Sequence, residues 1–148
     1  AVLSADQQKT SPVVVLGADT VVVLGSQIFG KPSDRADATR ILSQLQGTTH
    51  VVYTGHCCRR IDAGHHSEAA RIAMTKVTML PMSRSDIEAY VASGESDGRA
   101  GAYAIQETGD RFVADVQGAW DTIVGLNVAM MARLYCECTD SWPDGYRT

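Results

Sequence analysis

The chain has 148 residues, 45% of them hydrophobic, and a formal net charge of -4. A chain of this length buries roughly two-thirds of its unfolded surface as one domain, so it needs no metal ion or disulfide to stay folded. The acidic balance argues against a nucleic-acid binder. Because no apolar run approaches the length of about 18 residues that spans a membrane, and the first residues lack a secretion-signal pattern, we expect a soluble cytoplasmic protein.

The first predicted element is a β-hairpin that carries an acidic residue. Residues 13–16 and 20–24 are typical of a strand, Gly25-Ser26 of a turn and residues 27–31 of the returning arm. Asp19 interrupts the apolar run where we expect the most deeply buried strands. A carboxylate taken out of water needs a cation, a metal ion or hydrogen bonds beside it, so Asp19 is the first candidate for chemistry.

The hairpin also brings Lys31 back towards Asp19, in either of two registers. A two-residue turn pairs Thr20 with Lys31, whereas a three-residue turn pairs Val21 with Lys31 and points Lys31 to the face of Asp19. Only the longer turn is expected to aim both side chains into one site, and the sequence leaves both registers open.

A helix and a longer hairpin are predicted next. Ser33 is expected to cap a helix over residues 34–46, which ends at Gly47 and has an apolar stripe at helical spacing: Ala38, Ile41, Leu42 and Leu45. Residues 49–61 and 67–80 predict two strands around a turn at Asp62-Ala63-Gly64.

The carboxyl-terminal half predicts two more helices and a strand. Ser83 and Asp86 resemble a capping box for a helix that ends at Gly94, with Ile87, Tyr90 and Val91 as its apolar face. Residues 95–101 suit a substrate-facing loop, 111–116 a strand and 122–138 a closing helix. The last eight residues are expected to fray or to be docked by Trp142.

Two clusters of residues suggest chemistry on phosphate esters. A carboxylate such as Asp19 can bind Mg²⁺ or accept a proton from an attacking water, and an ammonium such as Lys31 can neutralise charge on phosphate oxygens. In the segment 98–106, glycines allow close approach of the backbone to a ligand, Arg99 offers a bidentate guanidinium and Gln106 an amide. A structural ion pair and an ordinary surface turn are the competing interpretations.

The cysteines and histidines suggest no second site. Cys57-Cys58 and Cys136-x-Cys138 lack the spacing of a zinc knuckle, so we expect reduced thiols. His65-His66 is expected in a solvated turn, and His50 and His56 in strands. A catalytic dyad of His56 and Cys57 is excluded because neighbouring strand residues point to opposite faces.

Several segments together resemble the Maf family of nucleotide pyrophosphatases, originally named for septum formation. They are LGADTVVVL, GKP, THVVYTG, IEAYVASGE, AGAYAIQ, FV and IVGL, in family order between about residues 14 and 126. The resemblance implies an α/β fold with a mixed, twisted sheet flanked by helices, similar to inosine triphosphatase. It also implies Mg²⁺- or Mn²⁺-dependent hydrolysis of nucleoside triphosphates to the monophosphate and pyrophosphate, and frequent dimers.

The resemblance assigns roles to five residues. Asp19 matches the catalytic and metal-binding aspartate, Lys31 the GKP lysine and Gln106 the glutamine of the AYGIQ motif. Arg99 stands where many members have a lysine, and Thr20, next to Asp19, is expected to contact substrate. The IQ form resembles the branch that acts on dTTP and UTP.

The chain also departs from the family pattern. Members carry an amino-terminal strand with an S-x-S-P-R-R phosphate loop and a D-x-x-E segment; neither occurs here, and Ser11-Pro12 is no substitute. We therefore expect residues 1–148 to be one Maf-like domain without its first strand and phosphate loop. Glu107 replaces a usual glycine, Asn127 a usual proline and Ala119-Trp120 the usual Asp-Tyr.

These departures leave two alternatives open. One is a nucleotide-binding regulator of septum formation or cell division without turnover. The other is an inert product with an unpaired sheet edge and a tendency to aggregate or dimerise.

Overall fold

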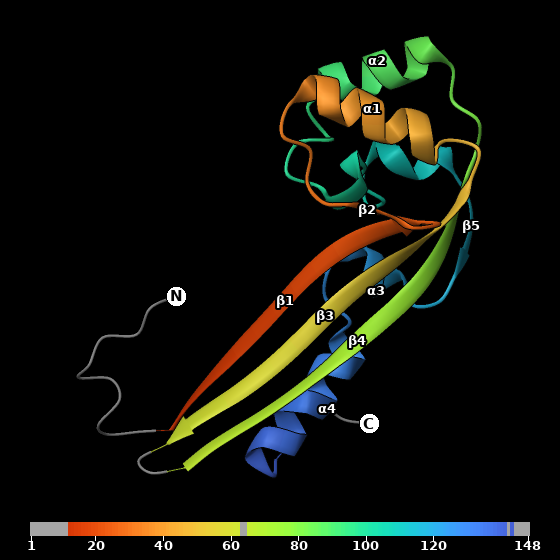
Figure 1. Ribbon diagram of the computed structural model, residues 1–148. Helices are drawn as coiled ribbons and strands as arrows, with labels where there is room; N and C mark the ends of the chain where they lie inside the picture. Colours follow the sequence, from red (N-terminus) through yellow and green to blue (C-terminus); the bar gives the residue numbers. More distant parts are fainter. Residues whose placement is uncertain (1–11, 63–64, 142, 144–148) are drawn as a thin grey trace.

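A five-stranded antiparallel sheet organises the chain, as a computed structural model shows for residues 12–62, 65–141 and 143 (Figure 1). The strand order is β2-β1-β3-β4-β5, with bounds Val13–Leu24 for β1, Gln27–Phe29 for β2, Thr49–Asp62 for β3, His65–Met79 for β4 and Val113–Gln117 for β5. The helices are α1 at Arg35–Leu45, α2 at Arg84–Ser93, α3 at Trp120–Val124 and α4 at Val128–Thr139. Two 3-10 turns, η1 at Ala100–Ala102 and η2 at Thr108–Phe112, lie between α2 and β5. The expected α/β architecture is confirmed.

The first hairpin uses the shorter of the two predicted turns. Leu24 pairs with Gln27, so the turn is the two residues Gly25-Ser26. β2 ends at Phe29, and Lys31 therefore follows the strand rather than pairing with Thr20. Because Lys31 is outside the strand, the alternation of a pleated strand no longer dictates its direction.

Asp19 is not deeply buried, contrary to the expectation from the sequence. β1 runs unbroken through Asp19, which pairs with Gly55 of β3 and is exposed. Only residues 22–24 of β1 pair with β2, so the described residues leave the rest of that edge of β1 unpaired. The apolar run misled because its residues 15–19 lie along this open edge, where a carboxylate stays in water.

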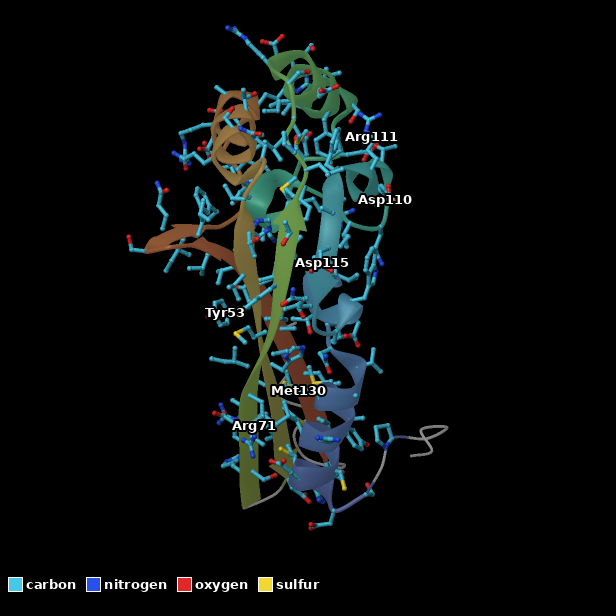
Figure 2. The ribbon with its side chains drawn as sticks, turned by 90° about the vertical axis from the view of Figure 1, so that its right-hand side faces the viewer. Tyr53, Arg71, Asp110, Arg111, Asp115 and Met130 are labelled. Carbon is cyan, nitrogen blue, oxygen red and sulfur yellow. The ribbon has the colours of Figure 1, made fainter. Side chains whose placement is uncertain are left out.

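Helices cover one face of the long strands. The even-numbered residues of β3 point to this covered face and are buried from His50 to Cys58, while α3 and α4 pack on β3 and β4. Tyr53 stands on the other side of the sheet from Met130 of α4 (Figure 2). We call that other side the bare face; its large, exposed apolar side chains are Val15, Ile28, Ile72 and Met74.

The first two helices form largely as predicted and pack over one end of the sheet (Figure 1). The stripe of α1 is buried as expected, but Asp34 rather than Ser33 is the cap, because its Oδ1 accepts from the Asp37 N–H at 2.8 Å. α2 has the predicted capping box of Ser83 and Asp86 and ends at Gly94 in the left-handed conformation.

The carboxyl-terminal predictions need two corrections. The single helix expected over residues 122–138 is two helices, because Gly125 has φ +110° and Asn127 caps a new helix through the Met130 N–H at 2.9 Å. β5 starts two residues later than expected, since Arg111 belongs to the preceding 3-10 turn. The predicted Ala63-Gly64 turn and the docking of Trp142 lie outside the described residues.

Candidate active site

One polar pocket lies where the open edge of β1 meets the loops after β2 and α2. Its volume is about 240 Å³, which is small for a ligand pocket, so a larger ligand would extend beyond it. The lining comes from β1, the residue after Gly30, the segment around η1, and α3: Ala18, Asp19, Thr20, Lys31, Gly98, Arg99, Ala100, Tyr103, Ala104, Ile105, Gln106, Ile123 and Val124.

The structure brings all five predicted site residues to this pocket. Asp19 and Thr20 come from β1, Lys31 from the GKP loop, and Arg99 and Gln106 from the two ends of the glycine-containing segment. Either register was expected to leave Asp19 and Lys31 neighbours, but the argument that only a three-residue turn would aim both into one site is wrong, since Lys31 reaches the pocket from beyond the strand. The catalytic and binding roles of the five residues stay predictions.

The two loops that carry the cations are joined through their backbones. The Gly101 N–H donates to the Gly30 carbonyl at 3.0 Å, which ties the loop of Lys31 to the segment of Arg99. Gly101 has φ +73°, and a Cβ at this position would lie 2.7 Å from Val22 Cγ2. A glycine is therefore required both by the backbone conformation and by the close approach to β1.

Arg99 is not free to bind an anion without competition. Its Nη2 lies 3.2 Å from Glu107 Oε1, in an ion pair whose two side chains are each 46% exposed. An exposed pair of this kind contributes roughly 0–1 kcal/mol, so a triphosphate could displace Glu107 at small cost. Glu107 is thus an internal competitor for Arg99 beside the pocket.

The wall formed by residues 103–106 is fixed by buried aromatic side chains. Tyr103 OH lies 2.9 Å from His50 Nε2, and burial lowers the pKa of His50 to about 4. Burial also raises the pKa of Tyr103, so the contact joins two neutral groups at neutral pH. Tyr90 of α2 accepts from the Ala104 N–H at 2.9 Å, which anchors the segment that ends at Gln106.

A chain of hydroxyl groups lies under the β1 side of the pocket. Thr20 Oγ1 is 2.9 Å from Thr54 Oγ1 of β3, and Thr54 donates to the Thr122 carbonyl of α3 at 2.7 Å. Thr54 is fully buried, whereas Thr20 is half-buried and lines the pocket. The segment THVVYTG contains Thr54, but periodicity alone shows only that it faces the core.

The side chains at the pocket could bind a metal ion only if the substrate supplies some of the metal ligands. Of the described residues that line it, Asp19 alone has a carboxylate, and no three His, Cys, Asp or Glu residues gather in the described ranges to hold an ion. Mg²⁺ is commonly bound by one or two carboxylates together with substrate phosphates and waters. Asp19 satisfies that pattern with a phosphate-bearing ligand.

The other candidates considered from the sequence do not form a second reactive site. The four cysteines are free, and burial raises the pKa of Cys58 to about 12, so this thiol stays protonated. His66 lies on β4 and is exposed. The described helices include none long and apolar enough to cross a membrane.

Comparison with known proteins gives one family model and several named relatives. The family model described as "Maf-like protein" matches residues 2–138. A dTTP/UTP pyrophosphatase of Anaeromyxobacter dehalogenans (strain 2CP-C) is 45% identical over 82% of this chain and 62% of its own length. The protein of the same name from Pelotomaculum thermopropionicum is 42% identical over 80% of this chain and 61% of its own, and the one from Gloeobacter violaceus 41% identical over 88% and 67%. The chain thus spans about six-tenths of the length of the first two relatives.

Proposed function

The chain belongs to the Maf family, and on that premise we propose that it is a nucleotide pyrophosphatase that converts a nucleoside triphosphate to the monophosphate and pyrophosphate. One observation carries the proposal: Asp19, Lys31, Arg99 and Gln106 come from distant segments and line one pocket. This set combines a base, two cations and an amide, which are the groups needed for hydrolysis of a phosphoanhydride.

In the proposed reaction, Asp19 acts on the attacking water. Its carboxylate is exposed at the edge of β1, where solvent reaches it, and it can accept a proton as the water adds to the α-phosphorus. The bond between the α-phosphorus and the bridging oxygen breaks, and pyrophosphate leaves. Asp19 would also hold Mg²⁺ or Mn²⁺ together with the phosphates, and such an ion supplies Lewis-acid stabilisation of their charge when bound.

The cations are proposed to bind the phosphates. Lys31 and Arg99 line the pocket from loops joined by a backbone hydrogen bond, so their spacing is set by the fold. Fixed charges of this kind stabilise the charge that builds on the leaving group. Gln106, on the exposed end of the anchored segment, would bind the base or the α-phosphate.

The proposed substrates are pyrimidine nucleoside triphosphates such as dTTP and UTP, or non-standard nucleotides. Support comes from the three relatives named dTTP/UTP pyrophosphatase and from the IQ form of residues 105–106. The expected role is removal of excess or non-standard nucleotides in the cytoplasm, a location supported by the four free thiols.

The test is release of pyrophosphate from dTTP, UTP and CTP by the purified chain with Mg²⁺ or Mn²⁺. Asp19→Asn is expected to lower the rate of pyrophosphate release at least about a hundredfold, which is roughly the contribution of a general base. Asp115→Asn is the matched control, because Asp115 is an exposed strand carboxylate outside the pocket that contacts Gln117. No release from any of the three nucleotides would refute the proposal.

A second candidate function is nucleotide binding without turnover, as in a regulator of septum formation or cell division. It is favoured by the single carboxylate among the described lining residues and by the pairing of Arg99 with Glu107. Calorimetry with dTTP separates the two functions: binding without release of pyrophosphate supports the regulator, and release supports the enzyme.

We also propose that a second copy of the chain packs against the bare face and leaves Asp19, at the open edge of β1, accessible to solvent. Ile72 and Ile28 are each 69% exposed there and Met74 is 54% exposed. β1, β3 and β4 are 12, 14 and 15 residues long, a strand rises about 3.3 Å per residue and neighbouring strands lie about 4.8 Å apart, so these three strands present roughly 650 Å², at the low end for one side of a standard interface. Ile72→Lys is expected to convert a dimer to a monomer in sedimentation. A wild-type monomer at micromolar concentration would overturn this proposal.

A further inference from the structure

The hydroxyl chain below the pocket has a fixed polarity. Thr54 lies 2.7 Å from the Thr122 carbonyl, which is only an acceptor, so the single hydroxyl hydrogen of Thr54 must point to it. The 2.9 Å contact between Thr20 and Thr54 then needs the hydrogen of Thr20. Thr20 therefore presents lone pairs, and no hydrogen, to the pocket that it lines.

Burial makes this polarity costly to reverse. Thr54 and Thr122 are fully buried, and the Thr122 carbonyl accepts from both Thr54 and the Gly125 N–H, the latter at 3.2 Å, so turning the Thr54 hydroxyl away would remove the shorter of its two hydrogen bonds. Thr20 is also confined on its other side, since a Cβ at Gly125 would lie 3.3 Å from Thr20 Oγ1. The orientation of the Thr20 hydroxyl is thus set by its contacts within the protein and not by the ligand.

We infer that Thr54 is a positioning residue that makes Thr20 an obligatory hydrogen-bond acceptor, and that Thr20 selects for a hydrogen-bond donor on the nucleoside part of the ligand. Phosphate oxygens are acceptors, so Thr20 is mismatched to them, and they are left to Lys31 and Arg99. The donors of a uracil or thymine nucleotide outside its phosphates are the N3–H of the base and the sugar hydroxyls. This inference rests on the proposed function, because it takes the ligand to be a pyrimidine nucleotide.

The chain offers a matched control for Thr54. Thr75 of β4 is also fully buried and donates to a carbonyl at the start of α3, that of Ala119, at 2.9 Å. Thr75 does not line the pocket, and its hydroxyl hydrogen bond goes to Ala119 rather than to the chain of Thr20 and Thr54. Loss of either hydroxyl loosens α3 from the sheet, but only the loss of Thr54 releases the hydrogen of Thr20.

The experiment measures binding of non-hydrolysable α,β-imido nucleotides by calorimetry. One arm compares the uridine and cytidine forms, which differ in polarity at N3, and the other compares the thymidine form with its 2′,3′-dideoxy analogue. For wild type and Thr75→Val, the affinity is expected to fall about tenfold in one of the arms, either from the uridine to the cytidine form or from the thymidine form to its dideoxy analogue. A tenfold change corresponds to one hydrogen bond. In the same arm, the affinity of Thr54→Val is expected to differ threefold or less between the two ligands. Thr54→Ser is expected to restore the wild-type ratio of the two affinities.

The outcomes separate this inference from the proposed function. The inference would be overturned, even if pyrophosphate is released, if Thr54→Val and Thr75→Val show the same ratio of affinities for the two ligands of an arm. It would also be overturned if wild type binds both ligands equally well in each arm. A ratio that depends on Thr54 in a chain that releases no pyrophosphate would sustain the inference and refute the enzyme. Failure to bind any nucleotide overturns both. If Thr54→Val does not fold, Thr20→Val, at a half-buried position, is expected to remove the same discrimination.

Discussion

Acidification is expected to destabilise the fold through His50. This side chain is 1% exposed, its Nε2 contacts Tyr103 OH at 2.9 Å, and its Nδ1 has no hydrogen-bond partner among the described residues. Burial lowers its pKa from 6.5 to about 4 because the charged imidazolium would be taken out of water.

The sign and size follow from proton linkage. Between pH 6.5 and 4 the unfolded chain binds a proton at this position that the folded chain does not, so stability falls as the pH falls through this window. The pKa difference corresponds to about 3 kcal/mol when complete, and to about 2 kcal/mol at pH 5. Since domains of this kind are stable by only about 5–15 kcal/mol, the loss should be easily measured.

The assay is urea unfolding followed by far-ultraviolet circular dichroism at pH 7 and pH 5. His50→Gln keeps a hydrogen-bonding group but does not titrate, so it should show about 2 kcal/mol less loss between the two pH values than wild type. His66→Gln, at an exposed position on β4, is the control and should behave as wild type. If wild type and His50→Gln lose the same stability, His50 does not carry the pH dependence.

Three further predictions follow from the packing and the pairing of charges. Glu107→Gln frees Arg99 and should tighten binding of a nucleoside triphosphate by up to roughly fivefold in calorimetry, with no gain for the uncharged nucleoside; equal gains for both ligands would contradict the competition. Ser83→Ala removes the capping box of α2 and should cost about 1 kcal/mol in urea unfolding, whereas Ser43→Ala on α1 should not. Gly101→Ala should cost about 1–3 kcal/mol, and an unchanged stability would show that the contact with Val22 relaxes freely.

Local patterns predicted most of the secondary structure. The stripe of α1, the capping box of α2 and the alternation in β3 depend on neighbouring residues, and the structure confirms them. The helix expected over residues 122–138 was wrong because apolar content hid the break at Gly125. Its left-handed conformation and the new cap at Asn127 are stabilised by tertiary contacts, including the Asn127 N–H that donates to His56 Nε2 at 2.8 Å.

The site was predicted for partly wrong reasons. Asp19 was selected because it should be buried, yet it is exposed at an unpaired part of the edge of β1. Lys31 was placed by strand register, yet it reaches the pocket from a loop. The family resemblance supplied both residues correctly as pocket residues, whereas Thr54 and Tyr103 could be recognised only from contacts between distant segments.

The hydrogen bond between Gly101 and Gly30 couples the two loops that carry the cations, so the pocket consists of two structural units, the sheet and the coupled loops. Asp19 and Thr20 belong to the sheet, while Lys31 and Arg99 belong to two coupled loops. A displacement of these loops would therefore carry both cations together and change their distance from the carboxylate without changing their own spacing. In hydrogen exchange, the Gly101 amide should report opening of this unit, and a nucleotide that bridges the two units should slow its exchange.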